Sequence, residues 1–432
     1  MLTARAVDLE EASLACGARV LLNALPESPR LAIDFFLPGG VSFEPAVGLS
    51  DMTDRLLLKG TTSRDQEAIA EAIDDLSLDL DADASRDYAM IGATLLEEDL
   101  DASLALIADI FYNGSLAEFE REKQRAAGEL LMELDVPRSR ASDLFYRTLF
   151  EGTPYGVTTS VLLENLPGLT RVEDVRAFYE GVFHPERLLI SVSGNITMDR
   201  VVAALDRHFP PAPQRVALPT TCPAAGTLSA YRLKTPRAVG FAREDAQQIH
   251  LFQGWLAPST TDPDYYPMMA LHTLLGGAGL TSRLFIELRD KQGLAYQVRS
   301  AYDAFRHQGL FVMYIGADPQ NRDRCVAGFQ TECQKLMDTP VSQKELGETL
   351  DNILGRRAVY LETTGQQASY IGSNLMMGRG VEDLGRVRER LQAVTVDDVQ
   401  RMARRTFSQP GVLAIAGPSQ TIAPLLDSPP LS

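Results

Sequence analysis

Two aspartates and an arginine share one face of a predicted helix in the stretch GLSDMTDRLLLKGT, residues 48–61. Helical spacing gathers Asp51, Asp54 and Arg55 on this face, while the apolar residues of the stretch turn toward a core. Carboxylates grouped in this way could hold a hard cation such as magnesium, which prefers oxygen ligands. A guanidinium beside them favours a salt bridge instead, and a solvated polar face on a surface helix is the third interpretation.

A second candidate pair lies in the other half of the chain, in LTSRLFIELRDKQGLAYQV, residues 280–298. Arg289 is expected at the end of a helix, Gly293 just past that end, and Tyr296 at the start of the next strand. Such a turn lets a guanidinium and a phenol project toward one cavity. The alternative interpretation is a helix-end charge and a tyrosine half-buried in a sheet.

The histidines and cysteines show no spacing typical of a metal site or a disulfide framework. No two histidines are three or four residues apart, so each is predicted to be a packing or surface residue. No C-x-x-C spacing occurs, so reduced structural thiols are predicted. These residues are His184, His208, His250, His272, His307, Cys16, Cys222, Cys325 and Cys333.

Length, composition and charge limit the classes of function. A chain of 432 residues predicts two or three domains, and 45% hydrophobic with 23% charged residues is ordinary for a globular protein. A net charge of -17 argues against nucleic acid as a partner, because phosphate contacts need clustered Lys and Arg. No apolar run approaches the ~20 residues that cross a bilayer. The first residues lack the apolar segment of a secretory signal, so the cytoplasm is the predicted location.

The chain contains a duplication whose halves are joined by the proline-rich stretch FPPAPQRVALPTTCPAAGT. This stretch predicts an extended, surface-running linker. Each half ends in a predicted N-capped helix, a turn and a buried strand, beginning at Thr170 and Thr395. The offset of about 224 residues is too long for a solenoid repeat. We therefore predict a first domain over residues 1–212, a linker over 213–228 and a second, homologous domain over 229–432.

Within each half, predicted strands come in a group and predicted helices follow in a group. RVLLNAL, RLAIDFFL and YAMIGATLL read as strands, with helices from about Asp101 to Phe150. IHLFQGWLA, LAYQVRSAY and GLFVMYIGA read as strands, with helices from about Asn321 to Phe407. This grouping predicts an α+β fold, in which each domain is an antiparallel-rich sheet covered by helices.

Several segments, in order along the chain, are similar to those of one peptidase family. GLSDMTDRLLLKGTTSR stands where the family has Gly-Leu-x-His-x-x-Glu-His leading into Lys-Gly-Thr. EFEREKQRAAGELLMELD matches the later helix that carries the third zinc ligand, and LLGGAGLTSRLFIELRDKQGLAYQV matches the Ser-Arg-Leu-Phe helix with its Arg…Gly-Leu-x-Tyr ending. With the duplication, the chain resembles the insulinase (pitrilysin) family of zinc metallopeptidases, in its half-length bacterial and mitochondrial-processing form.

The resemblance implies a degenerate zinc site in the first half. Asp51 and Arg55 stand at the two histidine ligands, Asp54 at the general base, Glu129 at the third ligand and Glu122 at a supporting acid. A guanidinium has no lone pair for a metal. It would repel a nearby divalent cation by roughly 4 kcal/mol per unit charge at an effective dielectric of about 20. We predict that Arg55 pairs instead with Glu129, shared with Asp51 or Asp54.

The retained Arg289 and Tyr296 imply a role in trans. By resemblance, the tyrosine donates a hydrogen bond to the tetrahedral oxyanion, and the arginine holds substrate backbone or the same developing charge. Some bacterial members of the family work as two different half-length chains, one with the zinc motif and one with only this pair. The chain resembles the second kind, with no cofactor of its own and with zinc in a homologous partner subunit. Its substrate would be a peptide, with no nucleic acid or membrane partner, and the isolated chain could form a homodimer.

The alternative function is a structural or peptide-binding subunit with no part in catalysis. The zinc-less subunit of the mitochondrial processing peptidase captures substrate through a long glycine-rich loop. The counterpart here, LLGGAGLTS, is short and is predicted to be a turn between helices, in which Gly276, Gly277 and Gly279 supply positive φ.

Overall fold

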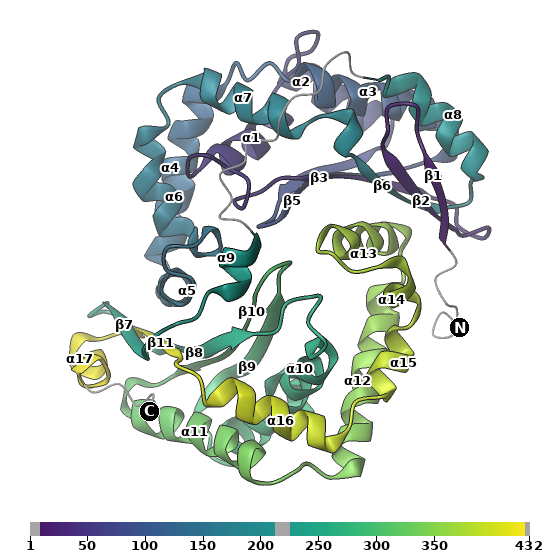
Figure 1. The fold of residues 1–432 in the computed structure, drawn as a ribbon. Coiled ribbons are helices and arrows are strands. Elements are labelled where there is room, and N and C mark those ends of the chain that lie inside the picture. Colours follow the sequence, from purple (N-terminus) through teal and green to yellow (C-terminus); the bar gives the residue numbers. More distant parts are fainter. Residues whose placement is uncertain (1–8, 212–224, 428–432) are drawn as a thin grey trace. The chain divides into compact units, whose positions relative to one another are not determined.

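A computed structural model describes residues 9–211 and 225–427, which form two compact units (Figure 1). The first unit comprises residues 1–128, 162–222 and 358–386, and the second comprises residues 129–161, 223–357 and 387–432. Each unit thus includes a segment from the other half of the chain. The boundaries predicted from sequence position alone, including the linker over 213–228, stay a prediction.

The linker prediction is tested only at its end. Residues 213–224 lie outside the described residues, and residues 225–230 form the short helix α9 (Ala225–Ala230). The prediction of an extended chain is therefore wrong for this end of the stretch. The physical reason is that Pro223 is its last proline, so no missing N–H interrupts the turn that follows.

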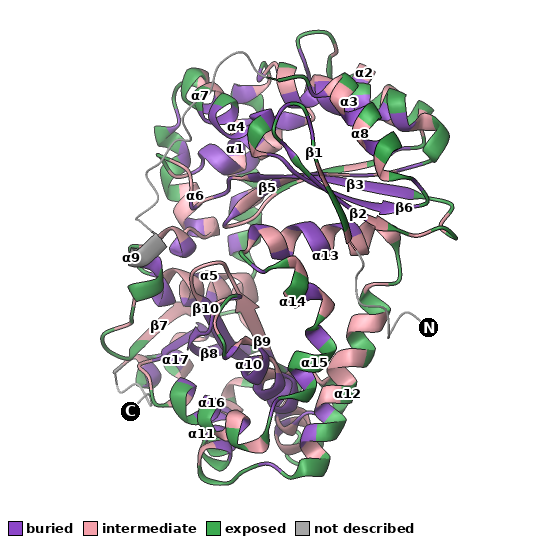
Figure 2. Ribbon diagram, turned by 45° about the vertical axis from the view of Figure 1, so that its right-hand side comes forward, coloured by how far each residue is buried: buried purple, intermediate pink, exposed green. Residues whose placement is uncertain are grey.

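The first unit is built on a six-stranded sheet with the order β1-β2-β6-β3-β5-β4. Its strands are β1 (Leu9–Ser13), β2 (Arg19–Ala24), β3 (Leu31–Pro38), β4 (Asp79–Ala84), β5 (Tyr88–Leu95) and β6 (Leu189–Gly194). Only β2 and β6 run parallel. The apolar run of β3 is buried in the middle of the sheet (Figure 2). By contrast, β4, with the alternating sequence DLDADA, lies at the edge.

The second unit repeats this topology with five strands in the order β7-β11-β8-β10-β9. They are β7 (Arg237–Ala242), β8 (Ile249–Ala257), β9 (Ala295–Ala304), β10 (Gly309–Ala317) and β11 (Val412–Gly417). Strand for strand this order matches β2-β6-β3-β5-β4, and β7 and β11 again form the parallel pair. The duplication therefore extends to strand order and direction, and β4 and β9 occupy equivalent edges.

Helices cover both sheets. Those of the first unit are α1 (Leu49–Leu57), α2 (Gln66–Asp75), α3 (Leu100–Asn113), α7 (Val172–Val182), α8 (Met198–His208), α13 (Thr364–Met376) and α14 (Val381–Gly385). Those of the second are α5 (Pro137–Leu149), α9, α10 (Tyr265–His272), α11 (Arg322–Asp338), α15 (Val387–Gln392), α16 (Val396–Phe407) and α17 (Ser419–Asp427). Three helices run across a unit boundary, namely α4 (Phe119–Asp135), α6 (Thr159–Asn165) and α12 (Gln343–Tyr360).

Aromatic side chains fill the core of each unit. In the first unit, the ring of Phe209 lies 5.2 Å from that of Phe35 on β3 and 5.5 Å from that of Phe111 on α3. In the second, the ring of Phe311 on β10 lies 5.8 Å from that of Phe407 at the end of α16. Such contacts fix the helices on one face of each sheet.

The other face of each sheet is covered by a helix from the opposite half of the chain. α13 packs on β3, β5 and β6, and α5 packs on β7, β8 and β11. Each contact needs a glycine, because a Cβ at Gly372 of α13 would overlap the ring of Phe36, and a Cβ at Gly254 of β8 would lie 2.7 Å from Phe145 of α5. The exchange of helices is thus specified by matched glycine and phenylalanine positions.

The predicted fold class is confirmed, and each of the six predicted strand segments contains a strand. One detail of the duplicated ends is wrong. Thr395 caps α16 through a capping box with Asp398, but the equivalent N-cap of α7 is Arg171, which makes no side-chain cap. Thr170 lies one residue too early to cap that helix. No described helix combines the length and the apolar character needed to span a bilayer.

Candidate functional site

The first predicted site lies on α1, which begins at an unusual N-terminus. Gly48 precedes the helix in the left-handed conformation (φ 95°), and the carboxylate of Glu44 accepts hydrogen bonds from the N–H groups of Gly48 (3.2 Å) and Ser50 (2.9 Å). A carboxylate here satisfies free N–H donors of the first turn. Burial nevertheless raises the pKa of Glu44 to about 7. With Met52 and Leu56 fully buried, the polar face of α1 is fixed in position.

Arg55 is paired within its own helix. Its Nε donates to Oδ2 of Asp51 at 2.8 Å, so the structure contains the Asp51 part of the predicted salt bridge. Asp54 faces other carboxylates. Burial raises the pKa of Asp54 to about 7, with a further rise from Asp83, Asp51 and Asp81 that Arg55 only partly offsets. A carboxyl group whose ionised form is disfavoured in this way binds a cation less well than an ordinary aspartate.

The two glutamates of α4 lie in different environments. Glu122 is buried, with its Oε1 3.4 Å from Nζ of Lys59 and 3.8 Å from Nη1 of Arg125. Lys59 and Arg125 thus balance the negative charge of Glu122, the residue predicted to be the supporting acid of a zinc site. Glu129 follows two turns later and belongs to the second unit, so its predicted pairing with Arg55 stays a prediction.

These residues do not fit a zinc ion. Zinc prefers neutral imidazole, thiolate or ionised carboxylate, and this face offers a guanidinium, a carboxylate held by it and a carboxyl group with a raised pKa. Across residues 9–211 and 225–427, no group of three or more His, Cys, Asp or Glu side chains is arranged to hold a metal ion.

The structure brings the second predicted pair together. The guanidinium of Arg289 lies 4.6 Å from the ring centroid of Phe285 and 4.9 Å from that of Tyr296. Arg289 lies in the last turn of the π-helical segment η7 (Phe285–Asp290), and Gly293 follows in the left-handed conformation (φ 62°). The predicted helix end and turn are thus present, and the arginine is stacked against two rings.

Tyr296 lies in a β-bulge on β9. Gly316 of β10 pairs with Gln297 and Ala317 pairs with Ala295, so no residue of β10 stands opposite Tyr296. Bulges redirect side chains and are common beside active sites. Tyr296 is 82% exposed, which rules out the interpretation as a tyrosine half-buried in the sheet.

The glycine-rich segment before this pair differs from the prediction. Thr273–Gly277 forms the π-helical segment η5. Of the three glycines predicted to adopt a positive φ, only Gly279 does so, with a φ of 68°. Gly276 and Gly277 are required by close packing, because a Cβ at Gly276 would overlap the N–H of Ser300 and one at Gly277 would lie 2.6 Å from Nε2 of His272. Burial lowers the pKa of His272 to about 4, so this histidine is a neutral packing residue.

Sequence reasoning missed the acidic partners of α1. Asp79, Asp81 and Asp83 alternate along β4, which contacts α1, and two of them raise the pKa of Asp54. The alternation in DLDADA was the available signal for one charged face.

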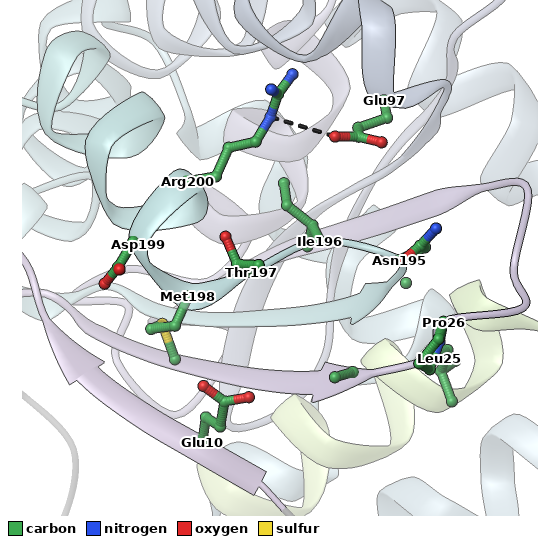
Figure 3. A pocket seen from close by; sticks show the side chains of 12 residues that line it. Glu10, Leu25, Pro26, Glu97, Asn195, Ile196, Thr197, Met198, Asp199 and Arg200 are labelled. Carbon is green, nitrogen blue, oxygen red and sulfur yellow. Dashed lines mark ion pairs between the residues drawn. The ribbon is translucent and has the colours of Figure 1, made fainter.

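A cavity of about 550 Å³ in the first unit does not contain the predicted site residues (Figure 3). It lies at the start of α8, where Arg200 points toward Glu97 and forms an ion pair of 3.3 Å. Two further carboxylates, Glu10 and Asp199, line it together with apolar side chains such as Ile196 and Met198. We assign it no function.

Models of protein families match both halves of the chain. The model described as "Insulinase (Peptidase family M16)" matches residues 19–160, and the one described as "Peptidase M16 inactive domain" matches residues 171–353. Among curated proteins, an uncharacterized zinc protease of Mycobacterium leprae is 28% identical over 96% of this chain and 93% of its own length. An uncharacterized zinc protease of Bacillus subtilis is 26% identical over 93% of this chain and 96% of its own.

Solved structures share the fold over nearly the whole chain. A protease from Helicobacter pylori matches with a TM-score of 0.85 at 20% identity, covering 96% of this chain and 100% of that one. A peptidase M16 inactive domain from Pseudomonas fluorescens matches with a TM-score of 0.82 at 20% identity, covering 95% and 98%. A chain of complex III from Candida albicans matches with a TM-score of 0.77 at 16% identity, covering 94% and 95%.

Proposed function

Because the chain belongs to the insulinase family, peptidase family M16, we propose that it is the non-zinc subunit of a heterodimeric metallopeptidase. It forms half of a peptide-degrading chamber and supplies Arg289 and Tyr296 to the zinc site of a homologous partner. The chain alone does not hydrolyse peptides, and its predicted location stays the cytoplasm.

The observation that carries this proposal is the geometry of the Arg289–Tyr296 pair. The phenol is 82% exposed on a bulged edge strand, and the guanidinium stacks on its ring at 4.9 Å. A tyrosine kept only for packing would be buried, since exposure of its ring contributes nothing to the core. An exposed phenol with an adjacent cation suits hydrogen bonding to the oxyanion of a tetrahedral intermediate.

The state of the first-unit residues supports the division of labour. Arg55 is paired with Asp51, and Glu122 is already balanced by Lys59 and Arg125. The attacking water is therefore activated in the partner subunit, while Tyr296 donates to the developing oxyanion and Arg289 holds substrate backbone or shares the charge.

The alternative is a structural or peptide-binding subunit of the same fold. The likeness to the complex III chain, at 16% identity, concerns the fold alone. The exposed Tyr296 favours the catalytic partner, because a scaffold has no use for an unburied phenol beside an arginine.

The test is Tyr296→Phe in the reconstituted pair. The partner is first identified by co-purification from the native cell, and the zinc content of both samples is measured. The variant should lower kcat of the pair by about 100-fold, the typical loss on removing one oxyanion donor.

Assembly with the partner should be unchanged, because the hydroxyl is exposed. Tyr302→Phe on the same strand, whose hydroxyl donates to the carbonyl of Pro258, is the matched control and should retain activity. Full activity of the Tyr296→Phe pair would exclude the proposed role.

A further inference from the structure

Two arginines of the second unit lie over one tyrosine ring without any acidic partner. The guanidinium of Arg138, on α5, lies 4.7 Å from the ring centroid of Tyr314, and that of Arg299, on β9, lies 5.9 Å from it. Neither forms an ion pair within residues 9–211 and 225–427.

Tyr314, whose ring lies under both guanidiniums, is held in place by its neighbours. Its Oη lies 3.0 Å from Nδ1 of His250, and its ring lies 4.8 Å from that of Phe252. Burial and the charge of Arg138 lower the pKa of His250, so this neighbour stays neutral and adds no repulsion. The two cations are therefore held near each other by a fixed platform before any ligand arrives, which reduces the entropy cost of binding.

Most donors of the two guanidiniums remain available. Arg138 gives one N–H to Oε1 of Gln297 at 3.4 Å, and Arg299 makes no hydrogen bond to the described residues. Arg299 is exposed on β9, and α5 begins without a side-chain cap or an acidic residue in its first turn. Each guanidinium carries five N–H donors in a planar fork that matches a carboxylate.

The arginines lie on the same side of the sheet as Tyr296. Ala295 and Val298 pack into the core, so alternation and the bulge place Tyr296, Gln297 and Arg299 on the opposite side. Arg299 lies three positions after Tyr296, about 10 Å along the strand. An extended peptide whose scissile bond lies at Tyr296 would place a side chain about three residues away beside Arg299.

We propose that Arg138 and Arg299 form a carboxylate clamp on the Tyr314 platform that binds an acidic group of the peptide substrate. The idea that this ligand is a peptide rests on the proposed function. The clamp itself rests on the two arginines that lack acidic partners. It makes peptides with a carboxylate near the scissile bond the preferred substrate class, although the protein as a whole carries a net charge of -17.

The test measures binding of fluorescent nonapeptides to the purified full chain by anisotropy, without the partner subunit. One acetylated and amidated peptide carries a single central aspartate, and its twin carries asparagine. A third peptide carries the asparagine and a free C-terminal carboxylate. We expect the aspartate peptide to bind about tenfold more tightly than its twin, the scale of a charge-assisted hydrogen bond. Tighter binding of only the third peptide would assign the clamp to a peptide terminus instead of a side chain.

Variants connect the preference to the two arginines. Arg138→Gln and Arg299→Gln should each reduce the aspartate preference to about threefold or less, and the double variant should abolish it. Arg324→Gln, which removes an equal charge from an exposed position on α11, should leave it intact. Equal binding of all three peptides, or an equal loss with Arg324→Gln, would overturn the clamp.

The outcome is independent of the proposed catalytic role. If the chain prefers the aspartate peptide but the pair with Tyr296→Phe keeps full peptidase activity, the clamp is supported and the oxyanion role of Tyr296 is refuted. The reverse combination would retain the oxyanion role and remove the clamp. Unchanged thermal melting of each variant shows that a lost preference does not reflect unfolding.

Discussion

The edge strands β4 and β9 are equivalent in the duplicated topology but differ in charge. β4 presents Asp79, Asp81 and Asp83 on one face of a regular strand, whereas β9 presents Arg299 and the bulged Tyr296. Side chains at an exposed edge contribute little to the core, so a duplication can keep its sheet while the edges change chemistry. The shared strand order therefore does not imply a shared function for the two units.

The helical segments before these edges differ in the same way. α1 of the first unit is a regular α-helix, on which Arg55 pairs with Asp51, and nearby Lys59 pairs with Glu122 of α4. The second unit has the π-helical η7, whose Arg289 guanidinium lies over the rings of Phe285 and Tyr296. Irregular segments of this kind cost stability and are frequent at functional sites. The proposed role of the second unit rests on this difference, since Tyr296 is exposed beside Arg289.

The largest expected effect comes from Arg289. Arg289→Met retains a side chain that packs against Phe285 but removes the charge, and it should lower kcat/KM of the reconstituted pair by about 100- to 1,000-fold. Arg289→Lys keeps the charge but loses the planar fork, so its loss should be smaller, about tenfold. Steady-state peptidase assays of the pair measure both. If kcat/KM of the pair with Arg289→Met stayed within twofold of the wild-type value, Arg289 would have no role in catalysis, and the proposed functional difference between the two units would be refuted.

The sequence predicted those elements that depend on local pattern. The apolar spacing of α1, the turn at Gly293 and the position of Arg289 at a helix end follow from residues close in sequence. The strands followed from short β-rich runs. These features need no knowledge of distant residues, and they contain Asp51, Asp54, Arg55, Arg289 and Tyr296.

The features missed by sequence reasoning depend on distant neighbours. A π-helix and an α-helix share nearly the same apolar pattern, so packing decides between them at η7. The bulge at Tyr296 is set by the register with β10, and the exchange of α13 is set by the fit of Gly372 on Phe36. Asp54 acquires its raised pKa from Asp83 on another element. None of these contacts is visible in a single segment.

A smaller effect should follow from restoring imidazoles to α1. The combined variant Asp51→His, Asp54→Glu and Arg55→His places ligands one turn apart on a helix that is already formed. Zinc affinity should rise at least about 100-fold, because even the loss of an outer partner of a ligand costs about 10- to 100-fold. Zinc titration against a chelator measures this change.

A further substitution separates ligation from nonspecific binding. Adding Glu129→Gln to the combined variant should lower zinc affinity again, since Glu129 is the third ligand by resemblance. Equal zinc affinity of the wild type and the combined variant would show that geometry as well as residue identity has been lost in the first unit.

The smallest expected effect is the pH dependence of stability at Asp54. Its folded-state pKa, about 7, lies above its ordinary value of 3.8, so between these pH values the folded protein holds a proton that the unfolded chain has lost. Stability therefore falls as pH rises through this window. Asp54→Asn removes the penalty, and its unfolding free energy should exceed that of the wild type by about 2 kcal/mol at pH 8, roughly half of the full linkage value, and by about zero near pH 4.

Asp109 provides a control of opposite sign in the same unit. Burial alone would raise its pKa, but hydrogen bonds from Asn113, Thr61, Ser63 and Arg64 outweigh burial and lower it. Its contribution to stability is thus present above the unfolded-state pKa and lost as pH falls. Asp109→Asn should destabilise the protein by about 1–2 kcal/mol at pH 7 and by less toward pH 3. Urea unfolding of both variants across this range measures the two slopes. If the effect of both variants on the unfolding free energy changed with pH in the same direction, Asp54 on α1 would not be repelled by neighbouring carboxylates.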